Sequence, residues 1–167
     1  TISTDDGASW GTPTVVRDYA TTGYDARDVQ AEVLPSGRIA VVHSEYKAIG
    51  GHDAQRTIFF YSDDEGATWS TPVVVSTGMY GAYGGNDVGS DILSLPNGDL
   101  LIAGYATETD AASKQFGLYL TKSTDGGATW ANLCKPVPYS TYGVNAVEPQ
   151  IERFENGKLI MTFHTED

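Results

Sequence analysis

Several features that decide function in other proteins are scarce in this sequence of 167 residues. Cys134 is the single cysteine, so no intrachain disulfide can form and cysteine usage does not indicate a redox compartment. Lysine and arginine number 10 against 22 acidic residues, giving a formal net charge of −12, whereas a nucleic-acid partner requires a basic face. No apolar run reaches membrane length and no signal peptide is present. We therefore expect neither a nucleic-acid nor a membrane partner.

Metal-ligand motifs are also missing, because the histidines and acidic residues do not fall at a recognised metal-ligand spacing. We expect no metal and no cofactor. No segment shows a helical period of useful length. The chain instead consists of short apolar, β-rich runs separated by polar turns, and it contains 19 glycines. This pattern predicts an all-β protein.

One octapeptide occurs three times, and it organises the chain. Its aspartates are Asp5, Asp64 and Asp125, about 60 residues apart, which indicates repeated supersecondary units. Serine and aspartate side chains can hydrogen-bond the nearby backbone and glycine takes a positive φ, so each copy predicts a tight turn that its tryptophan covers. The copies span residues 3–10, 62–69 and 123–130.

A second turn repeats with the same period, at residues 34–37, 95–98 and 154–157. Each copy joins two apolar runs and predicts a β-hairpin. A third apolar run leads into the octapeptides at 62–69 and 123–130, at residues 57–61 and 117–121. A fourth run follows the octapeptides at 3–10 and 62–69, at residues 12–16 and 71–75. Four antiparallel strands in about 60 residues describe a blade of a β-propeller.

The octapeptide pattern Ser-x-Asp-x-Gly-x-Thr-Trp at blade spacing resembles the Asp-box of sialidases and related glycoside hydrolases, which are built on six-bladed propellers. The resemblance implies that Asp5, Asp64 and Asp125 are structural, because the Asp-box of that family lies on the face away from the active site. It also implies an extracellular, secreted protein that acts on glycans.

The strands divide residues 1–167 into one partial propeller domain of about three blades. We expect a half-blade at residues 1–20, full blades at 24–77 and 86–138, and a half-blade at 145–167. A six-bladed ring needs about twice this length. The chain is therefore expected to be part of a longer protein or a half-propeller that closes as a homodimer, because unpaired strand edges favour pairing.

Arg27 is the first candidate site residue. It stands eight residues before Pro35 of the first Leu-Pro turn, as the arginine of the family's Arg-Ile-Pro motif does, although Asp28 and Val29 replace Ile-Pro. By resemblance it is one of three arginines that bind a substrate carboxylate, for which the planar guanidinium is suited. The alternative is a surface arginine paired with Asp25 or Asp28.

Asp53 is the second candidate, in a Gly-rich connection at the rim where the family carries its catalytic acid. A bound sugar could desolvate this carboxyl and favour a general-acid role. Lys47 and His52 are expected to be neighbours that bind substrate. The alternative is a turn residue in a solvated loop.

Glu148 is the third candidate, at the start of a first strand and aligned with Asp28 two blades earlier. Sialidases carry a glutamate here that polarises a tyrosine nucleophile; the alternative is a solvated strand end. His164 occupies the place of the family's second arginine. A third arginine and a tyrosine nucleophile motif cannot be located in these blades.

Three interpretations follow. The chain is half of a sialidase-like exo-glycosidase that hydrolyses terminal sugars, with the sugar left open because related Asp-box propellers include arabinan-degrading enzymes. Alternatively, it is a glycan-binding half-propeller without catalysis, or a structural propeller. Activity on fluorogenic sialosides and arabinosides separates these interpretations.

Overall fold

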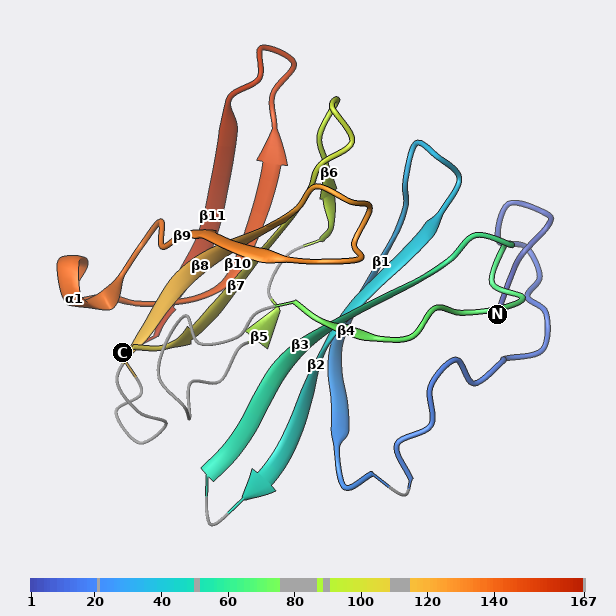
Figure 1. The fold of residues 1–167 in the computed structure, drawn as a ribbon, viewed down its shortest axis with the longest axis horizontal. Helices are drawn as coiled ribbons and strands as arrows, with labels where there is room; N and C mark the ends of the chain where they lie inside the picture. Colours follow the sequence, from blue (N-terminus) through green and yellow to red (C-terminus); the bar gives the residue numbers. More distant parts are fainter. Residues whose placement is uncertain (21, 50–51, 76–86, 89–90, 109–114, 167) are drawn as a thin grey trace.

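A computed structural model shows an all-β chain in which three sheets lie next to one another, together with one short helix (Figure 1). Every strand pairing among the described residues is antiparallel. No helix in the described part of the chain is long and apolar enough to cross a membrane. The structure describes residues 1–20, 22–49, 52–75, 87–88, 91–108 and 115–166, with backbone only for 47–49, 52–55 and 87–88.

The first sheet has four strands in chain order: β1 (Asp25–Val33), β2 (Ile39–Ile49), β3 (His52–Ser62) and β4 (Val73–Val74). Such a four-stranded meander is the blade that the repeat predicts.

The second sheet repeats this arrangement around β7 (Leu100–Thr107) and β8 (Phe116–Ser123). Its first strand is interrupted, since β5 (Asp87–Val88) and β6 (Leu93–Ser94) both pair with β7, and β9 (Ala131–Cys134) forms the other edge.

The third sheet has two strands, β10 (Asn145–Arg153) and β11 (Leu159–Glu166). The one-turn helix α1 (Tyr139–Tyr142) precedes it and ends at Gly143, whose φ of 67° lies in the left-handed region. Leu159, Ile160 and Phe163 of β11 are exposed. Their side chains have no cover of the kind that complete blades give to β2 and β7.

The hairpin turns follow from their sequence. In the first one, the amide of Gly37 donates to the carbonyl of Leu34 at 2.8 Å, and the amide of Leu34 donates to the carbonyl of Arg38 at 2.8 Å. Gly37 has a φ of 86°, which favours glycine. The turns at residues 95–98 and 154–157 make the same two hydrogen bonds.

The octapeptide turns are also alike, as the copy at residues 62–69 shows. Asp64 accepts two hydrogen bonds from Thr68, from the amide at 2.8 Å and from the hydroxyl at 2.5 Å. The hydroxyl of Ser62 accepts the amide of Gly66 at 2.8 Å. Hydrogen bonds from Thr68 and Ser62 lower the pKa of Asp64 to about 2. The same bonds to Asp5 and Asp125 lower the pKa of each carboxyl to about 2.

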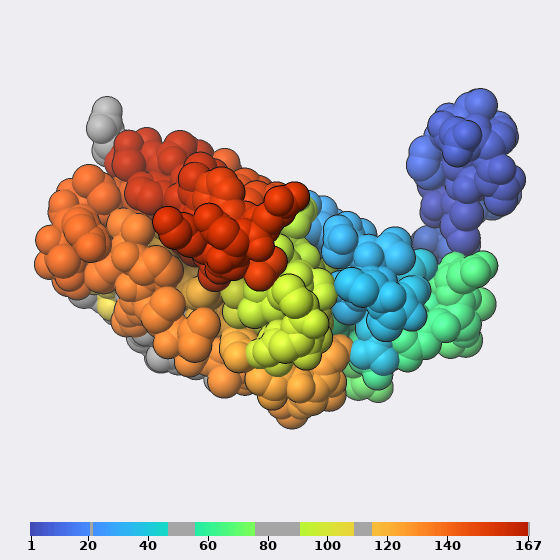
Figure 2. Space-filling model, turned by 90° about the horizontal axis from the view of Figure 1, so that it is seen from above, coloured from blue at the N-terminus to red at the C-terminus, as the bar shows by residue number. Residues whose placement is uncertain are grey.

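The first octapeptide differs from the other two in its surroundings. Its turn is formed, with Asp5 accepting from the amide and hydroxyl of Ser9, but residues 1–20 contain no strand. The expected pair of strands around this turn is therefore absent. β3 and β8 lead into the other two copies, whereas no strand flanks the first copy within residues 1–20. A hairpin lacking a partner strand is marginal. Much of this segment projects from the sheets (Figure 2, dark blue), whereas Arg17 and Tyr19 near its end contact the first sheet.

The core lies between neighbouring sheets. Val42 and Phe59 of the first sheet pack with Leu100 and Ile102 of the second, and Trp130 joins them at the octapeptide turn. A smaller cluster joins the second sheet to the third through Leu101, Leu120 and Ile151. This order of packing sets the three sheets side by side, with the two termini at opposite ends of the molecule (Figure 1).

Candidate functional site

The antiparallel strands give the molecule two rims that differ in chemistry. The hairpin turns at residues 34–37, 95–98 and 154–157 lie at one edge of the molecule (Figure 1). We call this edge, together with the three octapeptide turns, the repeat rim. We call the opposite edge the variable rim, where β1 and β10 begin and β2, β7 and β11 end. The candidate residues Arg27, Glu148 and His164 lie on strands near the variable rim.

Arg27 lies on β1 opposite Ser44 of β2. Its Nε donates to Asp25 Oδ2 at 2.8 Å, and its guanidinium stacks over the ring of Tyr46 at 4.4 Å from the centroid. The pairing with Asp25 is the one anticipated for a surface arginine. The side chain remains 55 % exposed, so a ligand carboxylate can reach the guanidinium.

Asp28 and Glu148 occupy the same position in two blades. The pairing register shifts after Arg27 in β1 and after Val147 in β10, so a bulge places each carboxylate. Their φ angles are 55° and 49°, in the left-handed region that residues other than glycine seldom adopt. Strained positions of this kind concentrate at functional sites. The alignment of Glu148 with Asp28 therefore has a structural basis in the bulge.

Glu148 and His164 are brought together across β10 and β11. The distance from His164 Nδ1 to Glu148 Oε2 is 3.5 Å, and the other ring nitrogen lies 4.0 Å from Glu166 Oε1. Val147 and Pro149 on either side of Glu148 are buried, whereas the Glu148 side chain is 66 % exposed. Buried neighbours fix the backbone and leave the carboxylate facing solvent. This pair and the Arg27–Asp25 pair belong to different sheets.

The remaining candidates lie in the β2–β3 hairpin. Asp53 is placed opposite Ala48, His52 opposite Ile49 and Lys47 opposite Ala54 in the strand register. Their side chains lie outside what the structure describes. Among the described residues, no three histidine, cysteine, aspartate or glutamate side chains gather as metal ligands.

The structure adds a cluster that the sequence did not reveal, centred on Glu45 of β2. This glutamate is fully buried. Its Oε1 accepts from Arg17 Nη2 at 2.9 Å and from the Tyr19 hydroxyl, and its Oε2 accepts from Arg56 Nε at 2.5 Å. The Tyr19 oxygen also lies 3.0 Å from His43 Nε2. We call these five residues the Glu45 network.

The electrostatics of the Glu45 network favour a charged carboxylate and a neutral phenol. Burial acts to raise the pKa of Glu45, but hydrogen bonds from Tyr19 and Arg56 outweigh it and hold the pKa below the ordinary value. Burial, and then the hydrogen bond to Glu45, raise the pKa of Tyr19 well above that of a free phenol. Burial lowers the pKa of His43. Tyr19 is thus held as a hydrogen-bond donor, and its surroundings do not favour a phenolate nucleophile.

One signal in the sequence could have indicated part of this network. The hairpin register places Glu45 directly opposite Arg56, and opposite charges facing across two strands form a stabilising pair. Arg17 and Tyr19 come from the segment before β1, which no strand pattern connects to Glu45. Their contribution required the three-dimensional arrangement.

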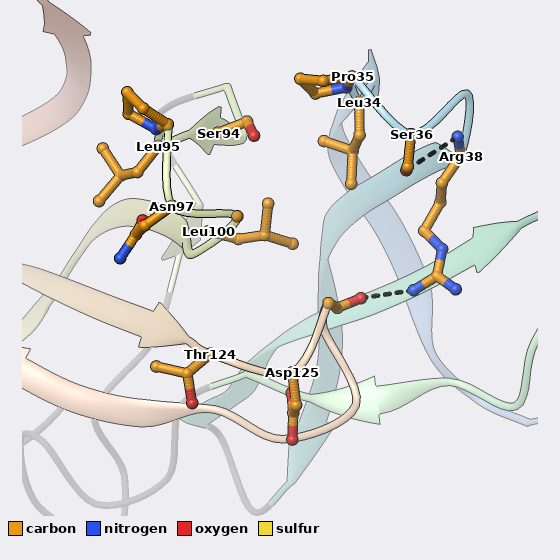
Figure 3. A pocket seen from close by; sticks show the side chains of 13 residues that line it. Leu34, Pro35, Ser36, Arg38, Ser94, Leu95, Asn97, Leu100, Thr124 and Asp125 are labelled. Atoms are coloured by element: carbon orange, nitrogen blue, oxygen red, sulfur yellow. Dashed lines mark hydrogen bonds between the residues drawn. The ribbon is translucent and has the colours of Figure 1, made fainter.

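The cavities found among the described residues lie apart from the candidate pairs. A cavity of about 700 Å³ opens on the repeat rim between the first two sheets (Figure 3). Arg38 forms one wall; its guanidinium donates to both carboxylate oxygens of Asp63 at 2.7 and 2.8 Å and to the carbonyl of Gly126 at 2.7 Å. A second cavity of about 330 Å³ borders the Glu45 network and is lined mostly by apolar side chains, including Val29 and Phe60. None of Arg27, Glu148 and His164 lines either cavity.

The sequence profile of the BNR repeat-like domain matches residues 1–167. The chain belongs to the BNR repeat-like domain family. Among curated proteins, no sequence matched the chain.

Solved structures share the fold of this BNR repeat-like chain. Hadza microbial sialidase Hz136 superposes with a TM-score of 0.76 at 19% identity, over 96% of this chain and 34% of that protein. A Dyadobacter fermentans protein of unknown function superposes with a TM-score of 0.75 at 20% identity, over 96% of this chain and 49% of that protein. Trypanosoma rangeli sialidase in complex with sialic acid superposes with a TM-score of 0.67 at 16% identity, over 98% of this chain and 28% of that protein.

These similarities confirm the sialidase-like, all-β propeller fold that the octapeptides predicted. The chain spans less than half the length of each of these three structures.

Proposed function

We propose that this BNR repeat-like chain contributes one part of the active site of a sialidase-like exo-glycosidase, which hydrolyses terminal sugars of extracellular glycans. The observation that carries the proposal is the Glu148–His164 pair, in which Glu148 lies on a strained bulge with its carboxylate exposed to solvent. The similarity to two sialidases supports the same lineage.

In this proposal Glu148 activates the nucleophile. A phenol is a weak nucleophile near neutral pH, and a carboxylate within hydrogen-bond reach withdraws its proton as the glycosidic bond breaks. The nucleophile itself would come from residues outside this chain, because no tyrosine nucleophile motif can be located in its sequence. His164 supports Glu148 through their contact of 3.5 Å.

Substrate binding is assigned to Arg27 and, from the β2–β3 hairpin, to Lys47 and His52. The Arg27 guanidinium is half exposed and oriented by Asp25 and Tyr46, so a sugar carboxylate can displace or share its contact with Asp25. Asp53 takes the role of the general acid. His164 binds an anion in its protonated form.

The decisive experiment compares Glu148→Gln with Glu152→Gln in the longer protein or closed ring that supplies the nucleophile, by hydrolysis of fluorogenic sialosides and arabinosides. Glu152 lies on the same strand and is exposed, so it controls for a lost surface charge. We expect turnover to be abolished in Glu148→Gln and unchanged in the control, with identical circular dichroism spectra. Full turnover in Glu148→Gln would remove Glu148 from the site.

A second candidate function is glycan binding without catalysis, in a ring completed by a second copy or by further residues of a longer chain. It is favoured by the exposed apolar side chains of β11, which pairs on one side only among the described strands. Light scattering on a sizing column tests the two routes. A mass twice that of the 17.8 kDa chain supports a homodimer, and a monomer contradicts it.

A further inference from the structure

The Glu45 network lies directly behind the residues that hold Arg27. Ala26 is opposite Glu45 in the strand register, and the next pairs along the strands are Asp25 with Tyr46 and Arg27 with Ser44. Successive side chains of a strand point to opposite faces. Glu45 and the Arg27 group therefore occupy the two faces of the same strand ends.

The contacts of Arg27 with Asp25 and Tyr46 both involve residues adjacent in sequence to a member or a partner of the network. Tyr46, which stacks on Arg27, follows Glu45. Asp25, which pairs with Arg27, follows Tyr24, and the Tyr24 ring lies 4.4 Å from the Arg56 guanidinium. The network thus holds the start of β1 and the part of β2 that faces it from the other side of the sheet.

The composition of the network also suits a fixing role. A fully buried carboxylate with ion pairs to two arginines joins the segment before β1 to β2 and to β3. Replacing a buried pair by apolar residues is often neutral for stability, and in some proteins such a pair serves to specify one arrangement of the chain. The arrangement specified here is the register and orientation of the strand ends that carry Arg27.

We propose that Glu45 is a positioning residue for Arg27: through Arg56, Tyr24 and its neighbour Tyr46, it orients the Arg27 guanidinium toward an anionic sugar. The inference rests on the proposed function of Arg27. It adds a residue that does not touch the substrate and that lies on the opposite face of the sheet.

The first test follows Arg27 itself and needs no ligand. The Nε–Hε signal of Arg27, assigned with an Arg27→Lys variant, reports the order of the guanidinium by heteronuclear NMR relaxation. We expect Glu45→Gln to make this group markedly more mobile, while the exposed Glu32→Gln of β1 leaves it unchanged. An unchanged Arg27 signal in a folded Glu45→Gln protein overturns the inference.

The second test separates positioning from a general loss of structure. The probes are N-acetylneuraminic acid and its carboxyl-reduced analogue, titrated into the chain and its variants. We expect Glu45→Gln to weaken binding of the carboxylate about fivefold and to leave the reduced analogue unaffected. Equal weakening of both sugars indicates a structural role and contradicts the proposal.

A double-mutant cycle distinguishes the two ideas. If Arg27→Ala does not weaken carboxylate binding, the proposed function of Arg27 fails whatever Glu45 does. If Arg27→Ala weakens it but Glu45→Gln does not, the positioning role alone fails. The expected result is that Glu45→Gln has no further effect on carboxylate affinity when added to Arg27→Ala.

Discussion

The two rims of the molecule are built from the same strands, but the side chains repeat from blade to blade on one rim and differ on the other. On the repeat rim, the three octapeptide turns make the same hydrogen bonds with side chains of the same type. On the variable rim each blade differs: Arg27 faces Tyr46 in the first, and Glu148 faces His164 in the third. Uniform bonding serves a repeated architecture, whereas chemistry at a rim requires side chains that differ between blades. Substitutions on the repeat rim should therefore affect stability, and those on the variable rim should affect binding.

The largest effect is expected at Gly127 of the repeat rim. A Cβ there would lie 2.1 Å from Phe59 Cε1, and the φ of 95° is unfavourable for alanine. We expect Gly127→Ala to lower the free energy of unfolding by about 4 kcal/mol, from overpacking and backbone strain together. Urea denaturation measures it.

The matched control is Gly66→Ala, at the same octapeptide position in the preceding blade. Its φ is 88° and its nearest neighbour, Trp69, lies at 3.6 Å, so backbone strain alone should remain, about 1 kcal/mol. Equal effects of the two substitutions would contradict the role assigned to the inter-sheet contact of Phe59.

The octapeptide tryptophans should have graded effects. Trp69 is half-buried against Phe60, with ring centroids 5.4 Å apart, whereas Trp10 is 64 % exposed. Because Trp69 is not fully buried, we expect Trp69→Ala to destabilise by about 2–3 kcal/mol and Trp10→Ala by less than about 0.5 kcal/mol. Thermal unfolding of both variants tests whether the first octapeptide lacks a packed neighbour.

Acid should weaken the repeat rim. The pKa values of Asp5, Asp64 and Asp125 are lowered to about 2, so folding favours their charged forms. Their contribution to stability is present above the pKa of an unfolded aspartate and is lost as the pH falls from about 4 to 2. The melting temperature should decline over that interval, and less so in Asp64→Asn. An identical decline in that variant would assign the effect to other carboxyls.

The smallest effect on stability is expected on the variable rim. Arg27 and Asp25 form an exposed ion pair, with 55 % and 63 % of the side chains accessible. Exposed pairs contribute little, so Arg27→Ala should change the free energy of unfolding by at most about 0.5 kcal/mol. A loss comparable with that of Trp69→Ala would break the division between the rims.

The sequence predicted the features that depend on local chemistry. The turn at residues 34–37 and the octapeptide at residues 62–69 could be placed because glycine, serine and aspartate determine their backbone within a few residues. The alignment of Glu148 with Asp28 could be found because both follow from the repeat. These elements needed no information about neighbouring sheets.

Features that depend on contacts between distant segments could not be predicted. Arg17 and Tyr19 reach Glu45 across 28 and 26 residues, and nothing in their local pattern indicates a buried carboxylate. The strands expected around the first octapeptide are absent for a related reason: a strand forms when a neighbour pairs with it. The β-propensity of residues 12–16 was therefore not enough to form a strand.

Arg38 has a consequence for how repeated units are ordered. Its side chain donates hydrogen bonds to Asp63 in its own blade and to the carbonyl of Gly126 in the next blade, 88 residues away. The equivalent position holds Asp99 in the second blade and Lys158 in the third, and Asp99 pairs with Lys122 instead. Blades with nearly the same turns can thus be told apart by their neighbours. The Arg38 guanidinium therefore specifies which blade follows the first. Exchanging the order of two blades would leave every turn intact but would separate Arg38 from the carbonyl of Gly126.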